Sequence, residues 1–178
     1  IILVSLTLNT NATGVGKWSH EIAGALAARG HRPILWFDED LPTFAKHRRL
    51  KPLFAPVDLA FRLVRERRNF SAVIIHEPSG FWYGLLRRVW LSLPPMIAMS
   101  HGIETRVFRE MEFATKLGLA SVRRKSSLIA RLLRFWQSDG TLRLADHIIC
   151  LSSSDTHYAA TRLGIPSQHI TLMINGVG

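Results

Sequence analysis

Residues 1–30 read IILVSLTLNTNATGVGKWSHEIAGALAARG, and this stretch decides the fold class. It opens with a short apolar run, Ile1–Leu6, whose β-branched residues are typical of a buried strand. A polar stretch then leads to Gly14 and Gly16, after which apolar residues recur at helical spacing until Gly30, a typical helix stop. The stretch therefore predicts a strand, a glycine-bearing turn and a helix.

A glycine turn between a strand and a helix suits an anion, usually a phosphate group. Free N–H groups and the positive end of the helix dipole meet there, and glycine lets a ligand approach the backbone. A P-loop would need glycine in place of Asn11 and a hydroxyl residue in place of Trp18, so that motif is excluded. A dinucleotide fingerprint fits poorly, because Ser19 replaces its third glycine and Asp38 is only a loose candidate for its acidic residue. A tight turn that binds nothing remains open.

Length and composition describe a globular chain. Its 178 residues can hold one domain with a sizeable core, and an apolar content of 47% is that of a folded protein. The single cysteine, Cys150, lies in an apolar run, which excludes an internal disulfide and fits a reducing, cytoplasmic compartment. No run reaches the length of a transmembrane helix, and no basic leader precedes Ile1. Because the first residue is not Met, we expect a piece of a longer protein.

The net charge of +10 calls for an anionic partner. Nucleic acid, an anionic membrane surface and a phosphorylated substrate all fit this charge. No helix-turn-helix, RNP-like aromatic pair or zinc pattern is present, so no nucleic acid is expected. A basic α/β module that binds nucleic acid or another polyanion without catalysis stays an alternative. No His, Cys or carboxylate cluster has the spacing of metal ligands, so no protein-held metal is expected.

Strands and helices alternate along the rest of the chain. Short apolar runs predict five further strands, at residues 31–38, 72–76, 96–100, 147–151 and 169–174. This alternation predicts a single α/β, Rossmann-like domain, residues 1–178, with a mainly parallel sheet flanked by helices. Residues 105–144 are predicted to form a helical basic insertion within it. Ligands bind such sheets at the carboxyl ends of the strands, so five loops are expected to converge on one cleft: 7–16, 77–80, 101–104, 152–155 and 175–178.

Three parts of the chain resemble one known family. Residues 14–31 resemble its opening, which is a Gly-x-Gly turn, a helix and a Gly-His pair before the second strand. His101-Gly102 resembles the histidine of its acceptor domain, and residues 145–177 resemble its signature of Ala-Asp, strand, Ser, Gly-x-Pro, strand and Asn-Gly-Val. The sequence thus resembles the N-terminal, acceptor-side domain of a GT-B fold retaining glycosyltransferase of glycosyltransferase family four.

The resemblance implies one half of a GT-B fold, whose second, donor-binding domain is absent from this chain. It implies transfer of a sugar from a nucleotide-sugar, bound mainly by that second domain, to an acceptor with retention. No cofactor is expected in this domain, and the isolated domain is expected to be inactive; a binding module whose catalytic half lies on another chain also fits. His101 is the expected catalytic residue, and His76 is interpreted as mainly structural. The expected substrate-binding residues are Gly14, Val15, Gly16, Lys17, Glu77, Gly102 and Asn175.

A basic amphipathic helix is predicted inside the insertion. Its apolar face holds Leu128, Ile129, Leu132, Leu133 and Trp136. Such a helix suits the interface of an anionic membrane. The predicted membrane-contact residues are Arg124, Lys125, Arg131, Arg134 and Trp136. The acceptor is then expected to be lipid-linked or an envelope glycan, and the protein cytoplasmic and peripheral on the inner face of the membrane. A helix that faces the core, with solvated arginines, remains open.

Overall fold

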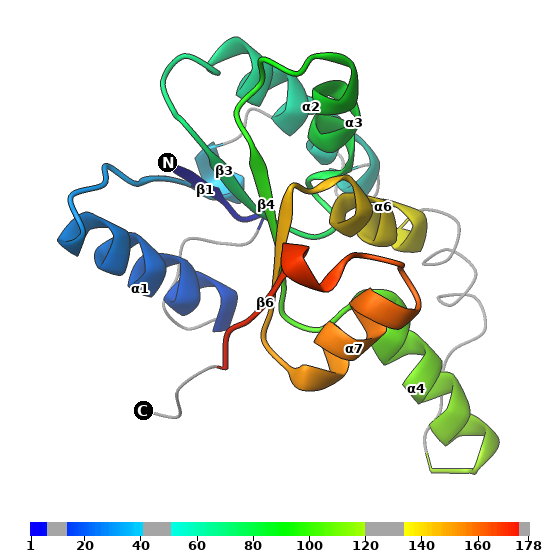
Figure 1. Cartoon of the computed structure of the whole chain (residues 1–178). Coiled ribbons are helices and arrows are strands. Elements are labelled where there is room, and N and C mark those ends of the chain that lie inside the picture. The colour runs from blue at the N-terminus through cyan, green and yellow to red at the C-terminus, as the bar shows by residue number, and fades with distance from the viewer. Residues whose placement is uncertain (7–13, 41–50, 120–133, 175–178) are drawn as a thin grey trace.

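The computed structural model describes residues 1–6, 14–40, 51–119 and 134–174 (Figure 1). Six parallel strands form one sheet in the order β2-β1-β3-β4-β5-β6. They are β1 (Ile2–Val4), β2 (Ile34–Trp36), β3 (Val73–His76), β4 (Met96–Ser100), β5 (His147–Cys150) and β6 (Ile170–Leu172). Each lies within a predicted run, so the Rossmann-like α/β fold is confirmed.

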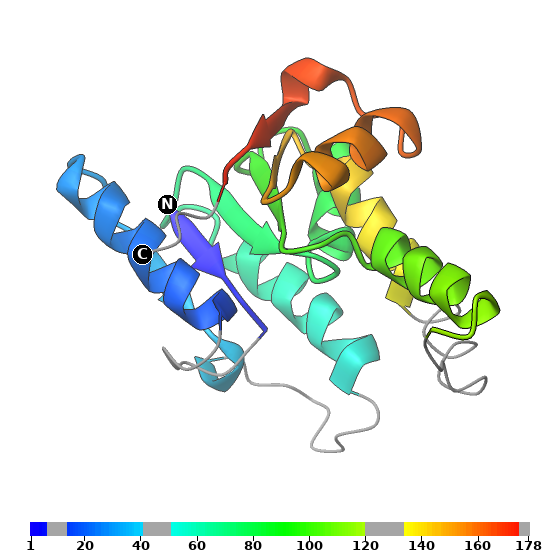
Figure 2. The same cartoon turned by 90° about the horizontal axis from the view of Figure 1, so that it is seen from below.

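Helices cover both faces of this sheet. One face is covered by α1 (Gly14–Ala28), and the other by α2 (Lys51–Arg65), α3 (Phe81–Val89), α6 (Trp136–Leu144) and α7 (Ser153–Thr161) (Figures 1 and 2). The helix α4 (Glu104–Lys116) projects from the rest of the domain. A short 3-10 helix, η1 (Asp38–Asp40), follows β2, and a second one, η3 (Ser167–His169), precedes β6. The arrangement is the layered build expected of βαβ units.

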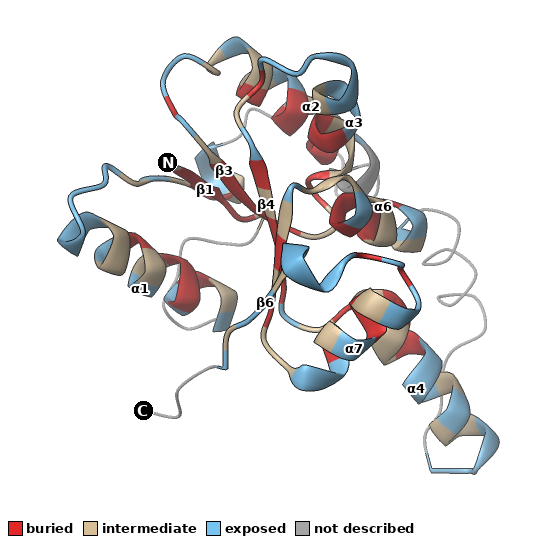
Figure 3. Cartoon of the chain, viewed as in Figure 1, coloured by how far each residue is buried: buried red, intermediate tan, exposed pale blue. Residues whose placement is uncertain are grey.

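The strand period of two sends alternate side chains to the two faces. In β1, Ile2 and Val4 pack into a core with Leu59 and Leu63 of α2, whereas Leu3 packs on the other face with Trp18 of α1. Figure 3 shows the resulting buried strips where the helices meet the sheet. Both faces need apolar residues, which explains why the strands read as continuous apolar runs.

The start of α1 differs from the predicted glycine turn. Gly14 and Gly16 lie inside the first turn of the helix, and neither has a positive φ. Glycine adopts the dihedral angles of a helix as well as those of a turn, so these residues are compatible with both structures. The predicted stop at Gly30 is confirmed: its φ is 83°, and the His31 amide donates to the carbonyl of Leu26.

Part of the predicted insertion, residues 105–144, forms a helix that packs into the core of the domain. Its last part forms α6, in which Gln137, Ser138, Thr141 and Leu142 are buried. This helix packs against α3 and β4 and connects α4 to β5. Residues 120–133 lie outside the described residues, so the predicted amphipathic face from Leu128 to Leu133 does too. The crossover between β4 and β5 therefore includes α6, as a parallel strand pair requires.

Close packing of α3 on α6 depends on Gly84. A Cβ placed there would lie 2.8 Å from the Leu144 Cβ and 2.8 Å from the Met96 Cε. We expect Gly84→Ala to lower the free energy of unfolding by about 1–3 kcal/mol, because the Leu144 Cβ cannot move without the helix. Gly24→Ala is the matched control: this helical glycine meets nothing within 4 Å, so alanine should stabilise by about 0.5–1 kcal/mol. Urea denaturation of both variants measures the difference, and equal effects would contradict the packing argument.

Candidate functional site

The strand order reverses next to β1, since β2 lies on one side of it and β3 on the other. Ligands of open parallel sheets bind at such a reversal, outside the carboxyl ends of the strands. A cleft of ≈ 480 Å³ lies there. Its walls come from the carboxyl ends of β3 and β4, from the segments that follow β1, β2, β3 and β4, from the first turn of α1 and the second turn of α2, and from Arg134, which precedes α6. Its lining includes Ser5, Leu6, Val15, Asp38, Pro56, His76, Glu77, Pro78, His101, Gly102, Glu104 and Arg134.

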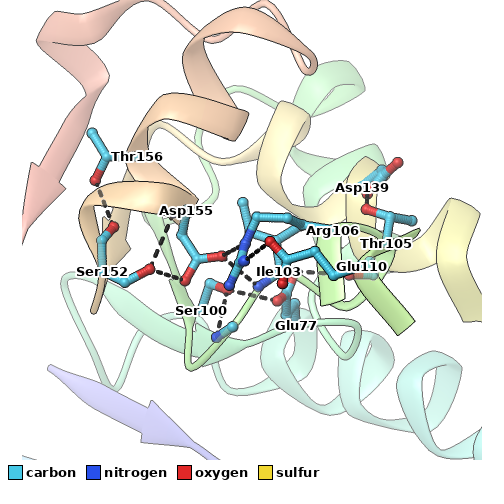
Figure 4. Close-up of polar contacts among 12 residues, drawn as sticks. Glu77, Ser100, Ile103, Thr105, Arg106, Glu110, Asp139, Ser152, Asp155 and Thr156 are labelled. Atoms are coloured by element: carbon cyan, nitrogen blue, oxygen red, sulfur yellow. Dashed lines mark hydrogen bonds and ion pairs between the residues drawn. The ribbon is translucent and has the colours of Figure 1, made fainter. Parts of the chain in front are cut away.

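Glu77 follows β3 directly and is held by hydroxyl groups from two other elements. The Ser100 Oγ of β4 donates to its Oε1, and the Ser138 Oγ of α6 donates to its Oε2, each at 2.7 Å. Figure 4 shows the contact with Ser100. Burial raises the pKa of Glu77 to about 8, although both hydrogen bonds act to lower it. The carboxyl group is therefore mostly protonated at neutral pH.

Two histidines stand beside Glu77 and stack on each other. The rings of His76 and His101 lie 4.8 Å apart at 22°, and the Trp18 ring meets both edge-on, at 5.5 and 5.6 Å. Burial, together with the nearby His101, lowers the pKa of His76 to about 3, and partial burial lowers the pKa of His101. Both imidazoles are therefore available as neutral hydrogen-bonding groups at neutral pH.

The loop that carries His101 is fixed by Asp155 at the start of α7. The Asp155 Oδ1 accepts hydrogen bonds from the Ile103 amide at 2.9 Å and the Arg106 Nε at 2.7 Å. The Ser152 Oγ donates to the Asp155 Oδ2 at 2.6 Å (Figure 4). Burial acts to raise the pKa of Asp155, but these hydrogen bonds and the Arg106 charge outweigh it and hold the pKa below its usual range.

The structure brings together only some of the predicted substrate-binding residues. Val15, Glu77, Gly102 and the predicted catalytic residue His101 line the cleft. Gly14 and Gly16 lie in the first turn of α1, beside Val15, and neither is among the lining residues. Lys17 also lies outside the lining, because it is exposed and forms an ion pair with Glu21 at 3.7 Å. Asn175 lies outside the described residues.

The predicted membrane-contact residues divide in a similar way. Arg124, Lys125 and Arg131 lie outside the described residues. Arg134 lines the cleft and pairs with Glu104 at 2.6 Å. Trp136 packs its ring on Phe81 at 4.7 Å and beside Trp82 at 6.3 Å. The membrane assignment therefore stays a prediction.

Several residues of the site were not predicted. His76 was expected to be structural but borders the cleft, and its place at the end of a strand beside Glu77 was the available signal. Ser138 is 61 residues from Glu77 in the sequence, and Asp155 is 52 residues from Ile103, so no local pattern joins them. Cys150 is buried as expected, and burial raises the pKa of its thiol to about 11.

The chain is a Rossmann-like domain of the α/β class, with a cleft at the strand reversal, where the ligands of such sheets bind. The sequence model of the family described as Glycosyltransferase Family 4 matches residues 12–178. The chain therefore belongs to glycosyltransferase family 4, and its role is in glycosyl transfer. No curated protein matches the chain.

Within residues 1–6, 14–40, 51–119 and 134–174, no helix combines the length and the apolar character needed to cross a membrane. Within the same ranges no three side chains of His, Cys, Asp or Glu come together as metal ligands do.

The raised pKa of Glu77 predicts how stability depends on pH. The folded state holds this proton up to about pH 8, whereas the unfolded carboxyl loses it near 4.5, so Glu77 makes stability fall as pH rises between these values. The slope from one proton is at most about 1.4 kcal/mol per pH unit. Glu104 and Asp139 add to the effect by repulsion.

We expect Glu77→Gln to flatten this slope, because the amide stays neutral and retains hydrogen bonds to both serines. Urea denaturation from pH 6.5, the ordinary pKa of histidine, to about pH 8 measures the slope of each protein. Equal slopes for the variant and the wild type would contradict the raised pKa. Glu21→Gln, at an exposed residue, is the control and should keep the wild-type slope.

Proposed function

We propose that this chain is the N-terminal, acceptor-side domain of a retaining GT-B glycosyltransferase. The donor is a nucleotide-sugar that a second domain binds in the main, and the acceptor is lipid-linked or an envelope glycan. The observation that carries this proposal is the convergence of His101 and Glu77 on one cleft in a chain of a sugar-transferring family. Activity then requires both domains, and this domain alone is inactive.

The chemistry assigns a role to each wall of the cleft. Sugar transfer builds negative charge on the departing diphosphate, and fixed hydrogen-bond donors aimed at it stabilise the transition state. The first turn of α1, which includes Val15, brings the positive end of the helix dipole to this cleft. The neutral His101 ring hydrogen-bonds the transferred sugar near the reacting carbon. Glu77 meets an acceptor hydroxyl.

The test is a transfer assay with the protein that joins this chain to a donor-binding domain. Radiolabelled UDP-, GDP- and dTDP-sugars are incubated with it and with a lipid extract or a glycan fraction, and NMR of the product gives the anomeric configuration. Transfer with retention supports the proposal, and inversion overturns it. The chain without the second domain is the matched control; transfer by the chain alone would contradict the division of roles.

An exposed patch at the end of α3 supports a membrane partner. Val89 and Leu91 are 86% and 80% exposed, Trp90 is 43% exposed, and the Arg67 guanidinium lies 4.7 Å over the Trp90 ring. Apolar side chains interleaved with arginine suit an anionic bilayer surface. The patch includes Arg88, which is also exposed.

Vesicle flotation tests this partner. With vesicles of phosphatidylglycerol and phosphatidylcholine at low salt, we expect binding that Leu91→Glu weakens. Ile174→Glu replaces another exposed apolar residue, 76% exposed and outside the patch, and should bind as the wild type does. Absence of wild-type binding would remove the membrane proposal. Retention of nucleic acid at moderate salt would favour the alternative, a polyanion-binding module without catalysis.

A further inference from the structure

The described lining of the cleft is acidic although the chain is strongly basic. The chain carries a net charge of +10. Apart from Glu77, whose carboxyl group is mostly protonated at neutral pH, the charged side chains of the described lining are Asp38, Glu104 and Arg134, so two carboxylates face one cation. A phosphate group of the acceptor that enters the cleft beside Asp38 or Glu104 would meet a carboxylate, whereas the departing diphosphate of the donor lies at the first turn of α1. An uncharged ligand avoids that repulsion.

Arg134 does not reverse this balance. Its Nη2 lies 2.6 Å from the Glu104 Oε1, so the one described cation of the lining is already paired with a carboxylate. An anion would have to break this ion pair or bind beside Glu104. A hydroxyl group can hydrogen-bond to either partner and leave the pair intact.

The floor of the cleft offers groups that suit hydroxyls. Burial raises the pKa of Glu77, and a protonated carboxyl both donates and accepts hydrogen bonds. Its oxygens are fixed by Ser100 and Ser138, so the group is held in place before a ligand arrives. A hydroxyl likewise both donates and accepts, which makes the two groups complementary.

His76 supplies an independent indication of a ligand. Its side chain borders the cleft and is only 9% exposed, yet its Nδ1 has no hydrogen-bond partner among the described residues. Buried polar atoms are almost always hydrogen-bonded, so the lack of a described partner for the His76 Nδ1 points to a partner outside the fold, such as a ligand. The His76 ring packs edge-on against Trp18 and stacks on His101, and these contacts hold it at the wall of the cleft.

We propose that the cleft binds an uncharged, hydroxyl-rich group, a sugar ring of the acceptor, and that His76 and Glu77 select it over a phosphorylated one. This inference rests on the proposed function and names the part of the acceptor that enters the cleft. The volume of ≈ 480 Å³ is within the range of about 300–1,000 Å³ that small-ligand sites occupy. Any phosphate of a lipid-linked acceptor stays outside.

Ligand-observed NMR tests the proposal with defined probes. The purified protein is titrated with methyl glucoside, methyl mannoside and methyl galactoside, and separately with glucose 6-phosphate, mannose 6-phosphate and inorganic phosphate. Labelled histidine reports whether the His76 and His101 ring signals shift. We expect at least one hexoside to bind and to shift both signals, and its 6-phosphate to bind at least tenfold more weakly. Stronger binding of the phosphorylated sugar would overturn the proposal.

Two substitutions at His76 separate recognition from packing. His76→Leu keeps a similar volume without a polar atom and should weaken hexoside binding about tenfold, because a buried hydrogen bond is lost. His76→Asn keeps a polar atom near the Nδ1 position and should retain more of the binding. His31→Leu, at an exposed histidine outside the cleft, is the control. Unchanged binding in His76→Leu overturns the role of His76.

Competition on the wild-type protein covers the case in which His76→Leu does not fold. Inorganic phosphate that leaves the hexoside bound supports the proposal, and phosphate that displaces it overturns it. Failure of the proposed function is distinguishable, because hexoside binding can persist in a protein that transfers no sugar. Transfer onto a phosphate-bearing end without hexoside binding would overturn this inference alone.

Discussion

Replacing His101 with alanine is expected to lower the kcat of sugar transfer by about 100-fold or more, the usual effect of removing one donor aimed at a transition state. The ring stands at the end of β4, lines the cleft and stacks on His76, so it is placed before substrate binds. Steady-state kinetics of the two-domain protein measure the loss. Circular dichroism checks that the fold remains, and an unchanged kcat would exclude a catalytic role.

Two controls sharpen this experiment. His31→Ala removes an exposed histidine that is outside the cleft and should leave kcat unchanged. The second control is the pH profile of the wild type. Since partial burial lowers the pKa of His101, the neutral ring persists below pH 6.5, the ordinary value for histidine. The acid limb attributable to His101 should therefore lie below that pH.

Asp155→Ala is expected to lower the free energy of unfolding by about 3 kcal/mol or more, as the loss of one partner from a buried charge pair does. The substitution leaves the Ile103 amide and the Arg106 guanidinium without their shared acceptor. It also frees the loop that carries His101, so transfer should fall even where the variant is folded. Urea denaturation and transfer kinetics measure the two effects.

Glu110→Ala is the matched control, because Glu110 pairs with the same arginine. The Glu110 side chain is 62% exposed, whereas that of Asp155 is 2% exposed. An exposed ion pair contributes about 0–1 kcal/mol, so this variant should remain close to the wild type. Similar losses in the two variants would show that Asp155 does not act through its buried contacts.

The pH dependence of Asp155 runs opposite to that of Glu77. Its folded pKa lies below the ordinary value of 3.8, so its stabilising contribution is complete above that pH. The contribution is lost as pH falls through the lowered pKa, because the proton then has to enter the buried site. Acid titration of the wild type and Asp155→Asn should therefore diverge above that range and converge below it.

Local sequence was enough to predict the layers of this fold and part of its cleft. Apolar runs predicted the strands, since a strand buried on both faces must be apolar throughout. Gly30 predicted the end of α1, because glycine readily adopts the positive φ seen there. Glu77 was predicted because it directly follows a strand, and the carboxyl ends of parallel strands share one edge of the sheet. His101 and Gly102, which also follow a strand, were predicted from the resemblance to the family.

The exact start of α1 was not predictable in the same way. Gly14 and Gly16 are compatible with either a turn or the first helical turn, and the surrounding packing of Trp18 against β1 favours the helix. The position of α6 was also missed. The sequence before α6 is polar and basic, which is typical of an insertion. That one face of α6 is buried follows only from its packing on α3 and β4 in the folded protein.

The sequence by itself determined the alternation of strands and helices, the family and the residues that end the strands. Only the tertiary structure decided which distant side chains hold them, such as Ser138 with Glu77 and Asp155 with Ile103. It also decided that the described lining of the cleft is acidic within a chain of net charge +10. The physical reason is that backbone preferences are local, whereas burial, pKa and the balance of charge at a site depend on which segments the crossovers bring together.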